Sequence, residues 1–369
     1  MLLMLKDLIV LEISMERKAC IVYQEDLLPF ALKGRVYSID MNNCESKEDY
    51  ASFMTAFMDI YSAVIYFIST RVLQLSRANA DKIYNLLTSN RIQTPENKAR
   101  ISMMCHSVSL SDNYWVKYHN DSVTWSSICI RHNSLNDIFT MVALRGSSLS
   151  LEGNLCTPEV STEGAYAKGW KREGSSLWLY KKGEKKAKIE VIVSNLLDHT
   201  NVSHVHYEDA EDDGEYCCKC PCMTTDQLSI IDADTIQCYK ERQGINFFDY
   251  VTENFADDLY KMWIVDYLIA NYDRHYHNWG FIYDADTTEI LGLHPLFDHN
   301  GAFDKGTLKR PDVLYRGNEN MTMREAALYA WKRTSFTYKR DFNRDDFLEE
   351  EHYEEFMRRL NELERSYFV

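Results

Sequence analysis

Three oxygen-bearing side chains follow one another at a spacing that could bind a metal ion and orient a hydroxyl group. Asp273 and Asn278 lie in the segment Asp-Arg-His-Tyr-His-Asn, which also holds His275, and Asp298 ends the later segment His-Pro-Leu-Phe-Asp. A hard cation such as Mg²⁺ takes oxygen ligands, which Asn278 and Asp298 would supply. A free carboxylate at Asp273 could orient an attacking hydroxyl, so the set suits phosphoryl transfer. The alternative is a polar loop whose carboxylates only cap backbone groups.

The elements around these residues predict that they converge. Residues 256–270 predict a helix that is apolar almost all the way round from Tyr260 onward, and therefore buried. Residues 279–283 and 289–293 flank a turn-prone segment and predict a β-hairpin. Antiparallel pairing puts Asn278 opposite roughly His294, so Asp298 can turn back toward Asn278.

The order Asp-x-His-x-x-Asn, hairpin, Pro-x-x-Asp resembles the HipA-like serine/threonine kinases of the CtkA type. The resemblance implies that Asp273 is the catalytic base, that Asn278 and Asp298 bind Mg²⁺, and that His275 braces the loop. The loop is also similar to the Asp-Arg-His-x-x-Asn loop of phosphatidylinositol kinases, so a lipid or small-molecule kinase is an alternative.

A loop of small residues, Ser161–Lys168, precedes a predicted strand and could contact phosphate. Gly164 would let backbone N–H groups approach phosphate oxygens, and Lys168 adds a cation. The loop matches neither the Walker A motif nor the Gly-x-Gly-x-x-Gly pattern of protein kinases. By itself it is therefore equally well interpreted as an ordinary hairpin turn. Hydroxyls at Ser161 and Thr162 motivate a further hypothesis, autophosphorylation, which would repel the nucleotide.

The strand Leu177–Lys182 ends in two lysines. Because side chains alternate between the two faces of a strand, one lysine should point inward and the other to solvent. An inward lysine would neutralise the nucleotide phosphates, and comparison with the HipA-like pattern favours Lys181 over Lys182. The following helix, 187–198, carries Glu190 at the edge of its apolar face, from which it could pair with Lys181. The alternative for Glu190 is a solvated helix charge.

Four cysteines, Cys217, Cys218, Cys220 and Cys222, with His204 and His206 nearby, suggest zinc at first sight. The spacing Cys-Cys-x-Cys-x-Cys is not that of zinc knuckles, and on a strand three of the four share one face and converge poorly. The resemblance places Lys219–Met223 instead at the hinge between kinase lobes. Backbone groups of Lys219, Cys220 and Cys222 would there hydrogen-bond adenine.

Composition limits the classes of function. The chain has 369 residues, 45% of them apolar and 26% charged, as in a globular protein of two or three lobes. A net charge of −15 argues against a nucleic-acid partner. Ten cysteines and no signal peptide indicate reduced thiols in a cytoplasm. The apolar residues 60–68 lie between Asp59 and Arg71, too few for a membrane span, and predict a core helix.

The remaining pattern predicts an α+β, bilobal, protein-kinase-like fold with an additional N-terminal region. We expect strands in residues 1–43, helices in 47–90, a break at 94–97, strands at 114–118, 121–125 and 139–144, a hairpin of 201–207 with 215–222 around an acidic turn, and helices at 323–331 and 345–367. The expected domains are an accessory region (1–105), a β-rich N-lobe (106–225) and a mainly helical C-lobe (226–369). Residues 1–105 do not match the N-terminal subdomain of the larger toxin members of the family, so no antitoxin partner is established.

The function predicted from these features is ATP- and Mg²⁺-dependent phosphorylation of serine or threonine in a protein substrate. A pseudokinase or interaction module is the non-enzyme alternative. The presence of Lys181, Asp273, Asn278 and Asp298 together argues against it, because a binding module does not need the complete set.

Overall fold

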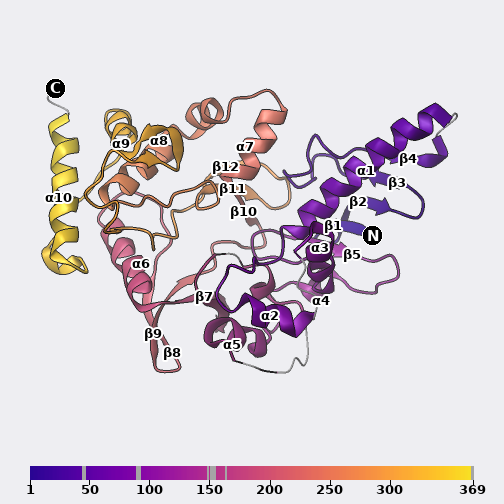
Figure 1. Cartoon of the computed structure of the whole chain (residues 1–369), viewed down its shortest axis with the longest axis horizontal. Coiled ribbons are helices and arrows are strands. Elements are labelled where there is room, and N and C mark those ends of the chain that lie inside the picture. Colours follow the sequence, from indigo (N-terminus) through magenta and orange to yellow (C-terminus); the bar gives the residue numbers. More distant parts are fainter. Residues whose placement is uncertain (44–46, 89–92, 148, 150–154, 163, 367–369) are drawn as a thin grey trace. The chain divides into compact units, whose positions relative to one another are not determined.

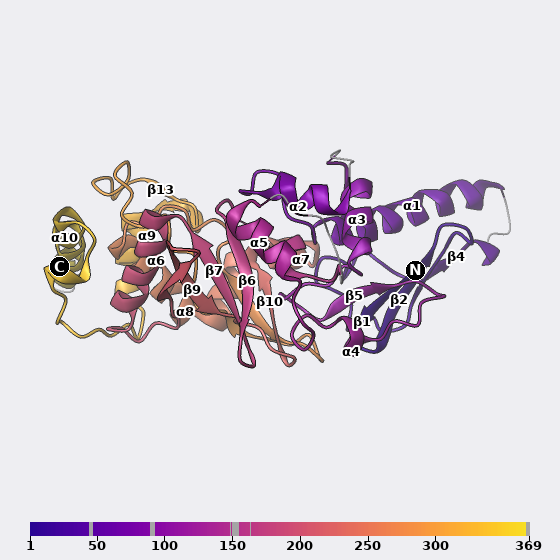
Figure 2. The ribbon, with the colours of Figure 1, turned by 90° about the horizontal axis from the view of Figure 1, so that it is seen from below.

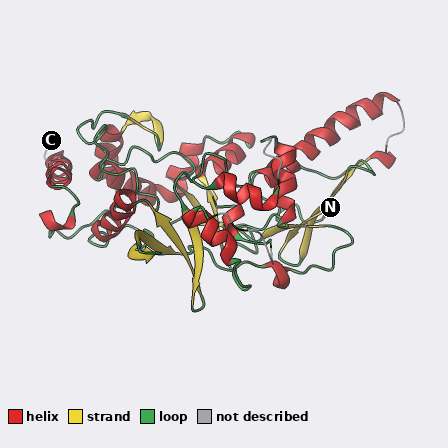
Figure 3. Ribbon diagram, turned by 60° about the horizontal axis from the view of Figure 1, so that its bottom comes forward, coloured by secondary structure: helices red, strands yellow, loops and turns green. Residues whose placement is uncertain are grey.

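The computed structural model describes residues 1–43, 47–88, 93–147, 149, 155–162 and 164–366. The chain forms two compact units. The first contains residues 1–179, 224–229 and 283–290, and the second contains residues 180–223, 230–282 and 291–369. Both units contain helices and strands (Figures 1 and 3), which confirms the predicted α+β class. The domain limits at 105 and 225 stay a prediction, because compact units and functional lobes are different divisions of a chain.

A five-stranded antiparallel sheet organises the N-terminal part of the first unit. Its strands, in spatial order, are β4 (Ile39–Asp40), β3 (Ala19–Val22), β2 (Leu8–Ser14), β1 (Leu2–Leu5) and β5 (Tyr114–Lys117). Leu3 of β1 pairs with Leu11 of β2 and with Val116 of β5. Strand β1 therefore lies between β2 and β5, two strands that are far apart in the sequence.

Helix α1 (Lys47–Ser69) lies along this sheet (Figure 2), and its Phe57 and Val64 belong to the same apolar core as the strands. The prediction of helix within 47–90 and of a core helix at 60–68 is therefore confirmed, whereas the apolar stretch is longer than its flanking residues Asp59 and Arg71 suggested. Among the described residues, the stretch Asp49–Ser69 is long and apolar enough to cross a membrane, a test that core helices also pass. Its packing against the strands is that of a core helix.

A second core in the first unit joins short helices from both sides of residue 105. These are α2 (Ala80–Leu87), α3 (Pro95–Met104), α5 (Asp137–Arg145) and the 3₁₀ turn η2 (Pro158–Val160). Ile83, Ile101 and Phe139 are buried together in it. The segment that leads into the predicted phosphate loop thus shares a core with helices of the N-terminal region.

Three local predictions in the first unit are wrong. Thr94 is not a break but the N-cap of α3, where its side chain accepts a hydrogen bond from Asn97 N and proline occupies the first turn. Residues 139–144 are helical rather than extended, because Asn136 caps α5 and Gly146, at φ 63°, terminates it. Residues 121–124 form no strand, and a short helix, α4 (Trp125–Ile128), follows them.

Helices dominate the second unit. They are α6 (Glu184–Leu197), α7 (Ala233–Arg242), α8 (Phe247–Leu268), α9 (Met323–Trp331), the 3₁₀ turn η3 (Arg344–Asp346) and α10 (Glu350–Arg365). The predicted helix 323–331 is confirmed, whereas α10 begins later than expected. Helix α8 bends at Phe255, is buried from Leu259 onward, and ends before Ala270, whose φ of 52° is a left-handed conformation common after helices.

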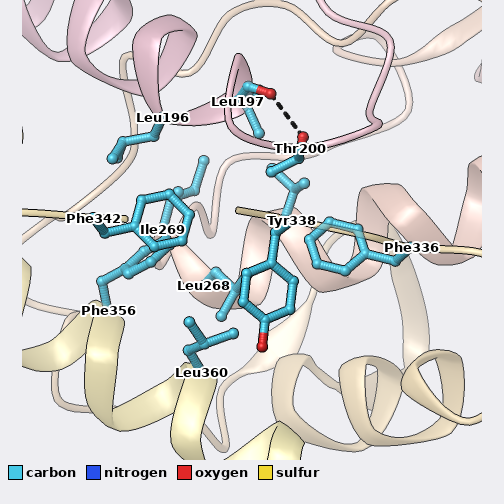
Figure 4. Close-up of a pocket in the computed structure, with 11 residues that line it drawn as sticks. Leu196, Leu197, Thr200, Leu268, Ile269, Phe336, Tyr338, Phe342, Phe356 and Leu360 are labelled. Atoms are coloured by element: carbon cyan, nitrogen blue, oxygen red, sulfur yellow. Dashed lines mark hydrogen bonds between the residues drawn. The ribbon is translucent and has the colours of Figure 1, made fainter. Parts of the chain in front are cut away.

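The core between α6, α8 and α10 contains a small void (Figure 4). Its volume is about 10 Å³, and Leu196, Ile269, Phe342 and Leu360 are among its apolar lining residues. Such a space holds about one water molecule at most. The void is therefore a small gap in the packing and not a ligand site, and the apolar side chains around it hold the helices together.

Strands β7 (Ser176–Lys182), β10 (Leu228–Asp232), β11 (Gly280–Asp284) and β12 (Ile290–Leu293) each continue from one unit into the other. The sheet orders are β6-β7-β9-β8, with β6 at Lys168–Glu173, and β10-β11-β12. Strands β13 (Leu314–Tyr315) and β14 (Asn318–Thr322) form a further pair. The predicted hairpin before Asp298 is confirmed, and His294 N donates to Gly280 O at 3.1 Å.

The hairpin of β8 (Glu208–Asp212) and β9 (Glu215–Pro221) differs from the prediction. The acidic run is itself the first strand, and residues 201–207 are not a strand. Asp212 pairs with Glu215, and the two residues between them, Asp213 and Gly214, both have positive φ. Asp-Gly favours this tight turn, and the turn therefore starts later than the acidic composition suggested.

Candidate active site

A buried lysine at the end of β7 is the centre of the candidate site. Lys181 Nζ lies 2.6 Å from Glu190 Oε1, 3.0 Å from Asp298 Oδ1 and 2.9 Å from Tyr207 Oη. Burial alone lowers the pKa of Lys181, but the carboxylates of Asp298 and Glu190 outweigh it and hold the pKa well above its usual value. Lys181 therefore carries its charge at the point where the two acids meet.

Glu190 connects that lysine to the segment after Asp298. It lies on α6 and is buried, with its second carboxylate oxygen accepting a hydrogen bond from His299 N at 2.8 Å. Glu190 therefore contacts both Lys181, the candidate phosphate-binding residue, and the backbone next to Asp298, the candidate metal ligand. This geometry does not fit the alternative of a solvated helix charge.

The neighbouring lysine has a different environment from the one expected. Lys182 was predicted to point to solvent, but its Nζ lies 2.6 Å from Glu215 and 3.2 Å from Asp212. Both acids belong to the β8–β9 hairpin, whose strand β9 is the neighbour of β7 in the sheet. Lys182 is an ion-paired structural residue, and Lys181 is the lysine that reaches Asp298.

The loop after α8 is held by a buried ion pair that the sequence analysis did not identify. Arg274 and Asp266 are both fully buried, with Arg274 Nε 3.0 Å from Asp266 Oδ2. Asp266 also accepts hydrogen bonds from Asn271 Nδ2 and Tyr315 Oη. A carboxylate on the otherwise apolar face of a buried helix needs such partners, and this requirement could have identified Arg274 from the sequence.

Arg274 also ties together the two segments that carry the metal-binding candidates. Its Nη1 donates to Asn278 O and to Phe297 O, each at 2.7 Å. Phe297 immediately precedes Asp298, so a single guanidinium holds the backbone beside both Asn278 and Asp298. Asp298 itself has φ 57°, an uncommon backbone conformation of the kind that persists where surrounding contacts enforce it.

Asp273 lies beside the same segments. Asn278 Nδ2 donates to Asp273 O at 2.9 Å, which leaves the amide oxygen of Asn278 as its potential metal ligand. Gly301 packs so closely that a β-carbon there would lie 3.0 Å from Asp273 Cβ. The segments 273–278 and 298–301 are therefore adjacent. An amide and a carboxylate oxygen form the hard donor set that suits Mg²⁺.

An arginine and a histidine contact Asp273. Arg316 Nη1 contacts Asp273 Oδ1 at 2.5 Å, and both side chains are partly exposed. His275 N donates to Asp273 O at 3.0 Å, and burial lowers the pKa of His275. The ring of His275 contributes to the loop through its Nδ1, which accepts from His277 N. His275 thus contacts the loop backbone, and Arg316 competes for the candidate base.

The predicted phosphate loop belongs to the first unit, and its residue 163 lies outside the described residues. Gly164 has φ 106° and lies against the Lys168 side chain. Thr162 Oγ1 donates to Pro158 O at 2.6 Å, and Ser161 Oγ donates to the same carbonyl at 3.4 Å. Both hydroxyls of the hypothesised autophosphorylation site therefore turn back onto η2.

Arg77 anchors this loop, a role that its sequence context does not predict. It is buried and donates to three backbone carbonyls, those of Glu159, Thr162 and Lys168. Ala78 N donates to Ala165 O at 2.9 Å, which adds a backbone contact. The N-terminal region therefore holds the loop in shape directly.

The predicted hinge residues lie at the end of β9. Cys220 is buried, and its thiol interacts with Lys181 and Tyr207, while burial raises its pKa to about 12. Lys219 Nζ lies over the Tyr180 ring, and Cys222 is partly buried. The compact-unit boundary falls directly after Met223. No group of potential metal ligands found among the described residues contains the β9 cysteines.

Comparisons with known proteins add a likeness of fold. No protein-family model and no curated protein matches the chain. It is similar to the Helicobacter pylori proinflammatory kinase CtkA, with 16% identity, a TM-score of 0.42, and coverage of 55% of this chain and 89% of that one. It is also similar to a chain in the complex of the Shewanella oneidensis MR-1 toxin–antitoxin proteins HipA and HipB with operator DNA. That match has 10% identity and a TM-score of 0.48, and covers 99% of this chain and 96% of the other.

Proposed function

We propose that the chain is an ATP- and Mg²⁺-dependent kinase that phosphorylates serine or threonine in a protein substrate. The observation that carries the proposal is the arrangement around Lys181 Nζ, which contacts Glu190 and Asp298 at 2.6 and 3.0 Å. A cation held by one acid and facing a second, metal-binding acid is the arrangement that positions nucleotide phosphates in kinases.

The chemistry assigned to each residue follows from its position. Asp273 accepts the hydrogen bond of the substrate hydroxyl and orients its oxygen toward the terminal phosphorus of ATP. Lys181 offsets negative charge on the phosphate oxygens, and Glu190 keeps the ammonium group in place. Asn278 and Asp298 would hold Mg²⁺, which supplies further neutralisation of the transferred phosphoryl group. The bond from phosphorus to the leaving ADP oxygen breaks as the bond to the hydroxyl oxygen forms, and the hydroxyl proton passes to the Asp273 carboxylate.

Arg316 adds a condition to this mechanism. Its contact with Asp273 Oδ1 must be displaced or shared when a hydroxyl approaches. Because about half of the Arg316 side chain is exposed, solvent compensates the loss of the contact, which is worth at most about 1 kcal/mol. Arg316 therefore does not prevent Asp273 from acting as the base.

The test is transfer of labelled phosphate from ATP by the full chain in the presence of Mg²⁺. Protein acceptors and phosphoinositide vesicles are offered in separate reactions, beside the Asp273→Asn variant and a matched control, Asp286→Asn, whose exposed carboxylate pairs with Lys6. We expect transfer to protein that is lost in Asp273→Asn and kept in Asp286→Asn. Transfer to lipid alone would assign a lipid kinase, and no transfer to either acceptor, with ATP still bound, would assign a pseudokinase.

A further inference from the structure

Two histidines and an aspartate form a compact cluster beside the C-terminal end of α6. Asp198 caps that helix, and His204 and His206 follow in the segment before β8. His204 Nε2 lies 3.3 Å from Asp198 Oδ1, and His206 Nδ1 lies 3.5 Å from Asp198 Oδ2. One ligand atom from each side chain lies within 4.8 Å of the other two. All three residues belong to the second unit.

One ring nitrogen of His204 is buried in this cluster without a hydrogen-bond partner. Its Nδ1 lies 3.1 Å from Val202 O, and because a carbonyl can only accept, Nδ1 carries the proton. Nε2 is then an acceptor in the neutral ring, yet it is buried and makes no hydrogen bond. The His204 side chain is only 10% exposed. A buried imidazole nitrogen 3.3 Å from a carboxylate oxygen, with no hydrogen bond between the two atoms, is unfavourable unless a cation lies near both of them.

We propose that Asp198, His204 and His206 bind a divalent transition-metal ion of the Zn²⁺ type. Bonds of about 2.0–2.1 Å to nitrogen and oxygen put the ligand atoms of a tetrahedral zinc site roughly 3.3 Å apart. The 3.3 Å from His204 Nε2 to Asp198 Oδ1 matches that edge, and one ligand atom from each of the three side chains lies within 4.8 Å of the other two. Imidazole and carboxylate ligands suit zinc and its neighbours rather than Mg²⁺. The side chains of His206 and Asp198 are about half exposed, so water can supply the fourth ligand.

Binding requires one local rearrangement. Ser194 Oγ lies 3.3 Å from His206 Nδ1 and accepts a hydrogen bond from Tyr207 N at 3.0 Å. The Ser194 hydroxyl can therefore donate to His206, and the metal replaces that weak contact. The β9 cysteines take no part, so the histidines that suggested zinc in the sequence act with a carboxylate instead.

The site would join two elements of the candidate active site. Asp198 ends the helix that carries Glu190, while the segment of His204 pairs with the one that leads to Asp298. Val205 N donates to Leu296 O at 2.8 Å, and Leu296 N donates to Ser203 O at 2.9 Å. A bound ion would hold the end of α6 against this pairing. The assignment of the metal site stands whether or not the chain is a kinase.

The test is metal binding by the full chain after removal of metals with a chelator. Zn²⁺ and Co²⁺ are titrated into the wild type, His204→Asn, His206→Ala and Asp198→Asn. The matched control is His199→Ala, because His199 pairs with a single carboxylate, that of Asp341, at 2.6 Å. Circular dichroism checks that each variant is folded, and X-ray absorption identifies the donor atoms.

We expect one equivalent of Zn²⁺, with nitrogen and oxygen donors at about 2.0–2.1 Å and no sulfur at about 2.3 Å. Loss of a group that only hydrogen-bonds a metal ligand weakens metal binding by roughly 10–100-fold. Loss of either histidine should weaken Zn²⁺ binding by more than this, while His199→Ala should bind Zn²⁺ like the wild type. Sulfur donors, equal binding in His206→Ala, or no binding by the wild type would each overturn the proposal. In the last case the His204–Asp198 contact is an ordinary ion pair.

Discussion

Replacing Arg274 by methionine is the most informative perturbation of the candidate site. Arg274 makes an ion pair with Asp266 in which both side chains are 0% exposed, and it also donates to Asn278 O and Phe297 O. The replacement removes all of these contacts but keeps apolar volume. It leaves Asp266 buried with only neutral partners, Asn271 and Tyr315. Removing one member of a buried pair costs about 3–5 kcal/mol.

The matched control is Arg316→Met, which breaks an arginine–aspartate contact on the surface. The Arg316 side chain is 50% exposed, so its ion pair with Asp273 is worth about 0–1 kcal/mol. Hydrogen exchange followed by mass spectrometry measures the local stability of residues 256–300 in both variants. A loss of 3–5 kcal/mol in Arg274→Met corresponds to about two to four orders of magnitude faster exchange. Equal exchange in the two variants would refute the assignment of Arg274 as the tie between the loop and Asp298.

Three further predictions test other parts of the account. Arg77→Met should raise the KM for ATP and speed exchange in residues 158–168, because three carbonyls lose their donor; an unchanged KM and exchange would contradict this. Mg-ATP should add the mass of one phosphate to the wild type but not to a Ser161→Ala/Thr162→Ala double variant, and an unchanged wild-type mass would refute autophosphorylation. Burial lowers the pKa of His294 to about 4 in the folded chain, whereas the ordinary pKa of histidine is about 6.5. Between pH 7 and 5 the unfolded chain therefore binds a proton that the folded chain does not, and the free energy of unfolding falls by roughly 2 kcal/mol. Chemical denaturation should show a smaller acid loss in His294→Asn, and parallel pH profiles would contradict the prediction.

Much of the candidate site follows from local sequence order. The spacing of Asp273, Asn278 and Asp298 around a hairpin with clear alternation predicts which segments converge. Strand alternation predicts that one of two lysines points inward, and the family resemblance favours Lys181. Helical periodicity then places Glu190 where it could pair with Lys181, and the structure has the two side chains 2.6 Å apart. These inferences work because short connections and regular periodicity leave few ways to arrange the chain.

Other features could not be predicted because they depend on contacts between distant residues. Arg77 reaches carbonyls more than 80 positions later, and nothing in its own neighbourhood indicates this role. Residues 139–144 are apolar and β-branched enough to suggest a strand, but packing in a helical core and caps at both ends decide otherwise. The turn at Asp213-Gly214, in contrast, is marked in the sequence, since Asp-Gly is a strong hairpin signal, but the acidic composition of residues 208–214 predicts a longer turn.

The central claim is that Asn278 and Asp298 bind one metal ion beside a separate base, Asp273. Metal-dependent ATP binding, followed by paramagnetic resonance of Mn²⁺ in place of Mg²⁺, tests it most directly. We expect one Mn-ATP bound per chain, weakened strongly by Asp298→Asn or Asn278→Ala, and kept without turnover in Asp273→Asn. Mn-ATP binding that is unchanged in both metal-ligand variants would contradict the account.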